Sequence, residues 1–182
     1  MEQKVDTYMK NLPQRKQLRL KDYDYSTSSY YFITICTQNR ECLFGTIVGA
    51  DSISARLEIV LNGAGKMIEM IYGNLINEFK GIELHEFVIM PNHIHGIVQI
   101  QENRADMESA PTNLSTVIQS FKRHTTINYI QGVKDNIYPP FNKSIWQRGY
   151  YEHIIRTEAE LNRIKEYILS NPEKWQEDKY YC

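Results

Sequence analysis

The sequence of 182 residues lacks any apolar run of the roughly 18 residues that a membrane-spanning helix requires. Its N-terminus also lacks the apolar stretch and the small-residue cleavage site of a secretory signal. Cysteine is scarce, since only Cys36, Cys42 and Cys182 occur and none belongs to a Cys-x-x-Cys pair. Neither a disulfide framework nor a thiolate zinc site is therefore expected, and we predict a cytoplasmic protein without a membrane anchor.

A large net charge is absent as well, because 21 Lys and Arg are balanced by 22 Asp and Glu. With 42% hydrophobic residues, this balance disfavours a disordered chain and fits one globular domain. The charge is nevertheless uneven: residues 1–21 carry six basic side chains against two acidic ones, and residues 113–150 carry five against one. Two cationic segments on a nearly neutral protein indicate either a phosphate-binding surface or solvated basic side chains.

Hydrophobic periodicity predicts strands that alternate with helices. We expect strands over 30–37, 83–90 and 93–100, a short strand over 54–60, and a strand or strand pair over 145–156. Helices are expected over 63–79, 114–130 and 158–170. Residues 1–28 form a basic arm and residues 29–182 a single domain. This order predicts an α+β fold, an antiparallel sheet with helices packed on one face.

Three local signals mark the expected helix ends. Asn62 is a candidate N-cap for the first helix. Thr157 and Glu160 form a capping box at the start of the last helix, and Pro172 disfavours helix at Asn171. The final helix is therefore expected to stop at Asn171-Pro172.

The sharpest local signal is His93-Ile94-His95, which follows the turn dipeptide Pro91-Asn92. Successive side chains of a strand alternate between faces, so His93 and His95 project from one side and Ile94 from the other. Two neutral imidazoles on one face can bind a single metal ion, which then needs at least a third ligand. Alternatively, the motif is a coincidence or a hydrogen-bonded surface pair.

The last helix offers such a ligand. Tyr167 and Asn171 are four residues apart and therefore share one face, beside the apolar stripe that should face the sheet. A carboxamide oxygen is a hard ligand that suits Mg²⁺ or Mn²⁺. The alternative is a tyrosine packed at the helix boundary with Asn171 as a C-cap.

Four blocks occur in order along the chain: YYFITICTQNRECLFG (30–45), ELHEFVIMPNHIHGIV (83–98), IWQRGYYEHIIR (145–156) and KEYILSNPEKW (165–175). Together they resemble the single-tyrosine HUH transposases, whose name denotes a His-hydrophobic-His motif, and within them the REP-associated tyrosine transposases. Four blocks in the right order are more specific than any one of them.

The resemblance implies a ferredoxin-like fold and assigns roles to four residues. It places the Mg²⁺ or Mn²⁺ ligands at His93 and His95, the nucleophile at Tyr167 and a further metal ligand at Asn171. Relatives with glutamine at the last position have a longer side chain, so Asn171 requires a closer approach of its helix to the sheet.

The implied activity is metal-dependent cutting and rejoining of single-stranded DNA beside hairpins of palindromic repeats, through a covalent 5′-phosphotyrosine. Such a protein would be associated with the nucleoid. The alternative is a catalytically silent module of the same fold that binds hairpin DNA or RNA. A homodimer is possible, and whether the tyrosine acts in cis or in trans stays open.

Seven side chains are candidates for nucleic-acid contacts through charge or stacking: Arg15, Lys16, Arg19, Lys122, Arg123, Arg148 and Tyr150. Each can instead be an ordinary solvated or packed residue. Core packing is favoured for Trp146, and a satisfied strand histidine for His153.

Overall fold

The molecule is built on a four-stranded antiparallel sheet, described in a computed structural model that covers residues 28–49, 57–101 and 112–181. The strands of this sheet are β1 (Ser29–Cys36), β4 (Ile82–Met90), β5 (His93–Ile100) and β6 (Tyr151–Ile155), in the order β4-β5-β1-β6. A separate two-stranded ladder pairs β2 (Gly45–Gly49) with β3 (Leu57–Leu61). The expected basic arm, with Arg15, Lys16 and Arg19, lies outside the described residues.

The helices complete a βαββαβ core. Helix α2 (Gly63–Glu78) precedes β4, α3 (Leu114–Lys134) connects β5 to β6, and α4 (Glu158–Ser170) follows β6. Short 3-10 turns lie at η1 (Gln38–Arg40) and η2 (Pro172–Glu177). This connectivity and strand order are those of a ferredoxin-like fold, so the predicted class is confirmed. Among the described residues, no helix is long and apolar enough to cross a membrane.

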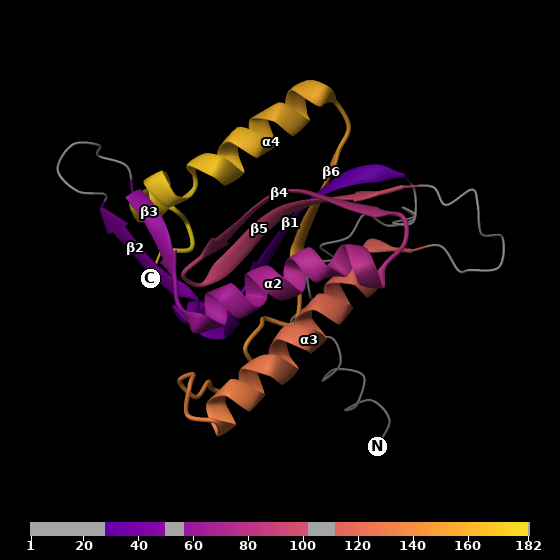
Figure 1. Ribbon diagram of the computed structural model, residues 1–182. Coiled ribbons are helices and arrows are strands. Elements are labelled where there is room, and N and C mark those ends of the chain that lie inside the picture. Colours follow the sequence, from indigo (N-terminus) through magenta and orange to yellow (C-terminus); the bar gives the residue numbers. More distant parts are fainter. Residues whose placement is uncertain (1–27, 50–56, 102–111, 182) are drawn as a thin grey trace, which may run out of the picture.

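Side chains of β1 alternate between two apolar layers. Ile33 and Ile35 belong to the larger core, shared with α2 and α3, whereas Phe32 packs in a second cluster with Ile168 of α4. Figure 1 shows α2 and α3 below the sheet and α4 above it. The prediction that the helices share one face therefore holds for α2 and α3 and is wrong for α4, whose apolar stripe covers the opposite face.

A close approach in the larger core explains the glycine after the histidine motif. The rings of Tyr72 on α2 and Phe87 on β4 stack with centroids 3.7 Å apart. A Cβ atom on Gly96 would lie 2.8 Å from the Tyr72 hydroxyl and 3.1 Å from Phe87. Glycine therefore lets α2 approach the strand that carries His93 and His95.

Most element boundaries agree with the sequence patterns, although α3 ends at Lys134 and not at residue 130. Asn62 caps α2 as expected, because its Oδ1 accepts the Gly65 amide at 3.0 Å. The strand expected over 145–156 is shorter, and Trp146 before it makes only an isolated bridge to Thr37. Strand β2 was not predicted. Cys42 is disulfide-bonded, which the sequence did not predict, while Cys36 is free.

Candidate active site

Two buried imidazoles converge on the face of the sheet that α4 covers. His93 and His95 are 0% and 1% exposed, and their Nε2 atoms lie 3.1 Å apart. The expected alternation is present, since Ile94 between them enters the opposite core. The pair is therefore held by β5 on one side of the sheet and is not a surface pair.

Neighbouring polar groups orient both rings. Asn92 donates through Nδ2 to the carbonyls of Arg40 and Tyr180, so its Oδ1 is the atom that accepts from His93 Nδ1 at 2.8 Å. His93 consequently carries its proton on Nδ1 and directs a lone pair from Nε2. His95 Nδ1 lies 2.8 Å from the Thr34 hydroxyl, which can accept or donate.

This arrangement can take up a cation between the rings. Without one, His95 can donate its Nε2 proton to His93, while Thr34 donates to His95 Nδ1. With a metal ion, His95 can instead hold its proton on Nδ1, and both Nε2 lone pairs face the ion. The hydroxyl of Thr34 suits either state.

Helix α4 supplies the phenol and the carboxamide. The helix begins at the Thr157 cap, whose hydroxyl accepts the Glu160 amide at 3.2 Å. Tyr167 Oη lies 3.3 Å from His95 Nε2 in the same chain. Asn171, at the C-cap, is 2% exposed, and its Oδ1 has no hydrogen-bond partner among the described residues. Such a buried acceptor is costly unless a ligand satisfies it.

The C-terminal segment covers the other side of the pair. Asp178 Oδ2 lies 3.9 Å from His93 Nε2, and one ligand atom each from His93, His95 and Asp178 fall within 4.8 Å of one another. The Tyr180 ring packs on His93 with centroids 4.6 Å apart. Asp178 is thus a metal-ligand candidate that the sequence patterns did not indicate.

The electrostatic surroundings keep the imidazoles neutral. Burial, followed by the neighbouring His95, lowers the pKa of His93 to about 2, and burial also lowers the pKa of His95 to about 3. Burial and the Asp178 charge raise the pKa of Tyr167, against a hydrogen bond from Asn171 and the charge of Lys179. Neutral imidazoles are ready to bind a metal, whereas the phenol needs help to ionise.

Comparisons with known proteins show the family to which the chain belongs. Residues 25–171 match the model of the family described as "Transposase IS200 like". This chain is an IS200-like transposase family member. It is 35% identical over 181 residues to an uncharacterized protein of Haemophilus influenzae, a match that covers 96% of this chain and 97% of that protein.

Two further proteins similar to this chain are described as REP-associated tyrosine transposases. A candidate REP-associated tyrosine transposase of Haemophilus influenzae is 31% identical over 110 residues, covering 54% of this chain and 60% of its own length. A solved REP-associated tyrosine transposase bound to a REP hairpin has the same fold, with a TM-score of 0.55 and 18% identity over 86% of this chain and 73% of that one. The resemblance to this family is therefore confirmed.

Of the predicted DNA-contact residues that the structure describes, the two on α3 lie apart from the histidine pair. Lys122 and Arg123 belong to α3, on the opposite face of the sheet. Lys122 Nζ donates to the carbonyls of Gln147 at 2.9 Å and Gly149 at 2.8 Å, and burial lowers its pKa to about 8. The residue between these carbonyls, Arg148, is exposed, and the Lys122 ammonium lies 5.6 Å from the Tyr150 ring centroid.

Two other expectations about aromatic and histidine side chains are met. Trp146 is buried and donates through Nε1 to Thr125 Oγ1 at 2.9 Å, as core packing predicts. His153 is a satisfied strand histidine, since its Nε2 lies 2.8 Å from Glu160 Oε1.

Proposed function

We propose that this protein is a metal-dependent single-stranded DNA endonuclease and strand transferase that acts beside hairpin DNA. A covalent 5′-phosphotyrosine on Tyr167 would link cutting to rejoining. One observation carries the proposal: in a single chain, the Tyr167 hydroxyl lies 3.3 Å from an imidazole of the converging, buried pair. Membership of a transposase family supports the same conclusion.

The donor set fits a divalent cation. His93 and His95 would supply neutral nitrogen ligands, Asn171 its unpartnered buried Oδ1, and Asp178 a carboxylate oxygen. Oxygen donors suit Mg²⁺ or Mn²⁺, and added imidazoles favour Mn²⁺ along with other transition metals. Such an ion, when bound, polarises the scissile phosphate and neutralises developing charge.

The residues around Tyr167 would prepare it as a nucleophile. Its oxygen would attack the scissile phosphorus, forming the phosphotyrosine bond and releasing a 3′-hydroxyl. The Asn171 amide and the Lys179 ammonium both favour the phenolate, because they lower the Tyr167 pKa. Because the phosphotyrosine conserves the bond energy, a 3′-hydroxyl can reverse the step without ATP.

Contacts to the rest of the DNA stay predictions at the residues named from the sequence. Lys122 would act by fixing the loop that exposes Arg148, since its ammonium donates to carbonyls on both sides of that arginine. Arg123 and Tyr150 would contact the strand near this loop, and Arg15, Lys16 and Arg19 would contact the hairpin. A protein of this activity would be cytoplasmic and associated with the nucleoid.

The test is to incubate a labelled REP hairpin with unpaired flanks in Mn²⁺, in Mg²⁺ or in EDTA, and to separate the products on a denaturing gel. We expect a metal-dependent protein–DNA adduct that Tyr167→Phe abolishes while hairpin binding is retained. Tyr181→Phe, which alters another exposed tyrosine of the same chain, should keep the adduct. Binding without any adduct in the unmodified protein would instead favour the silent hairpin-binding module.

A further inference from the structure

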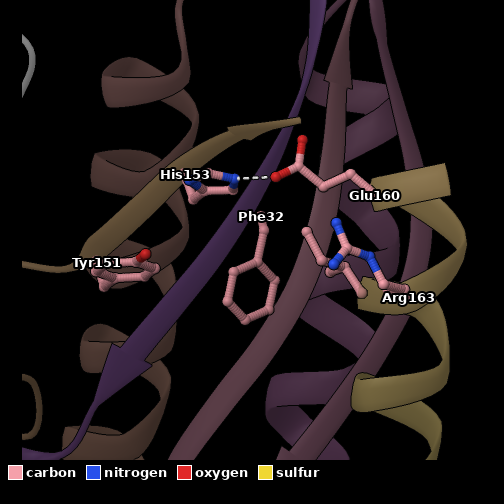
Figure 2. A pocket seen from close by; sticks show the side chains of 6 residues that line it. Phe32, Tyr151, His153, Glu160 and Arg163 are labelled. Carbon is pink, nitrogen blue, oxygen red and sulfur yellow. Dashed lines mark hydrogen bonds and ion pairs between the residues drawn. The ribbon is translucent and has the colours of Figure 1, made fainter. Parts of the chain in front are cut away.

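A cavity of about 340 Å³ opens next to Phe32, on the face of the sheet that α4 covers (Figure 2). Its lining side chains come from three elements, β1, β6 and α4: Phe32, Tyr151, His153, Glu160, Arg163 and Ile164. The mechanism above uses none of them. The volume lies at the small end of the range for ligand pockets, about 300–1,000 Å³, and suits one small planar group.

Aromatic rings form the walls of the cavity. Phe32 and Tyr151 stand edge to face with centroids 6.2 Å apart. Phe32 is nearly buried and belongs to the apolar cluster under α4, whereas Tyr151 is 46% exposed although it lies in a strand. Exposed aromatic rings beside a nucleic-acid site commonly serve as stacking platforms for bases, because every base has a π-face.

Polar side chains from both β6 and α4 line the cavity. His153 and Glu160 are paired at 2.8 Å, and the second Glu160 oxygen accepts the Arg156 amide at 3.0 Å. This pair is therefore internally satisfied. Arg163 extends from α4, as Glu160 does (Figure 2), and its exposed guanidinium offers donors for the carbonyl oxygens and ring nitrogens of a base edge.

The Phe32 ring separates the cavity from the candidate active site and contacts both. The Phe32 ring packs against His95 with centroids 5.3 Å apart and against Tyr167 at 6.0 Å, so one ring borders both spaces. Lys179 extends from the segment over the histidines, and its ammonium lies 5.9 Å from the Tyr151 ring centroid. A strand whose phosphate lies at Tyr167 would therefore bring an adjacent nucleotide to this cavity.

We propose that the cavity holds the base of an unpaired nucleotide next to the phosphate attacked by Tyr167, stacked on Tyr151 and contacted by Arg163. This inference rests on the proposed function and adds a subsite to it. The subsite selects a base that is out of the helical stack, so it positions single-stranded DNA for cutting and excludes a paired strand at this point.

The experiment measures equilibrium binding, so it does not require the protein to cut DNA. The full chain carrying Tyr167→Phe is titrated against a fluorescent REP hairpin with unpaired flanks, and each flank base is replaced in turn by an abasic nucleotide. We expect one abasic position at which affinity falls about 5- to 150-fold, the range of a lost base–aromatic stack. In the added background of Tyr151→Ala, the same abasic change should have almost no further effect.

Two more variants distinguish recognition of one base from a general weakening of DNA binding. Arg163→Gln should also reduce the effect of that abasic position, whereas Arg156→Gln, an exposed arginine outside the cavity lining, should leave it unchanged. If Tyr151→Ala and Arg163→Gln weaken binding equally on all flanks, with the abasic effect intact, the subsite does not exist. If the unmodified chain binds no hairpin at all, the proposed function itself is contradicted.

Discussion

Acidification should destabilise the metal-free protein through the two buried histidines. In the folded chain the pKa values of His93 and His95 are lowered to about 2 and 3 from an ordinary value of 6.5. The unfolded chain therefore takes up protons on these imidazoles near pH 6.5, whereas the folded chain does not. Stability is consequently full above pH 6.5 and falls as the pH decreases below it.

The magnitude follows from linkage. Each proton taken up only by the unfolded chain lowers the free energy of unfolding by about 1.4 kcal/mol per pH unit. At pH 5, which is 1.5 units below the ordinary value, the two histidines together would lower it by as much as about 4 kcal/mol. This is a large part of the roughly 5–15 kcal/mol that stabilises a typical domain.

The assay is urea unfolding at several pH values in EDTA, followed by the fluorescence of Trp146 and Trp175. His93→Gln and His95→Gln each remove one titrating group, so each should reduce the slope of unfolding free energy against pH by about 1.4 kcal/mol per unit. Equal slopes in the unmodified protein and both variants would refute the buried, neutral state of the pair.

Three further outcomes are expected. Mn²⁺ at about 100 times its Kd should raise the free energy of unfolding at pH 7 by about 2.7 kcal/mol, as measured by calorimetry. The increase should be far smaller in the His95→Gln variant, and an equal increase in both proteins would contradict the metal site. Thr157→Ala should cost about 1 kcal/mol in chemical unfolding and loosen the helix that carries the site, because it removes the α4 cap. Gly96→Ala should lower the free energy of unfolding in urea by about 1–3 kcal/mol. The loss should be smaller in a Tyr72→Phe background, which removes the hydroxyl nearest to the added Cβ. An unchanged loss would place the strain elsewhere.

Local patterns were sufficient for the elements that carry the site. The period-2 alternation around Ile94 predicted both the strand and the shared face of His93 and His95, because one side of β5 enters a core. The Thr157 capping box and the Asn171-Pro172 stop predicted α4 with the bounds that the structure has. These signals act over a few residues and need no knowledge of tertiary packing.

The parts that sequence patterns missed depend on contacts between distant segments. The position of α4 on the face opposite α2 and α3 depends on Phe32 and Ile168, which are far apart in sequence. Asp178 reaches His93 only because the chain turns after η2, and no periodicity marks that return. The Phe32 ring shared by the cavity and the site is likewise visible only once β1, β6 and α4 are assembled.

If Tyr167 is the nucleophile, its oxygen is the atom that becomes bonded to DNA. Peptide mapping of the covalent adduct identifies the residue that carries the DNA. The full chain is incubated with a REP hairpin and Mn²⁺ and digested with nuclease and protease, and its peptides are then analysed by mass spectrometry. We expect a nucleotide joined through its 5′-phosphate to Tyr167 and to no other residue. A nucleotide on a different side chain, or cut DNA with free ends and an unmodified Tyr167 throughout the reaction, would contradict this role of Tyr167.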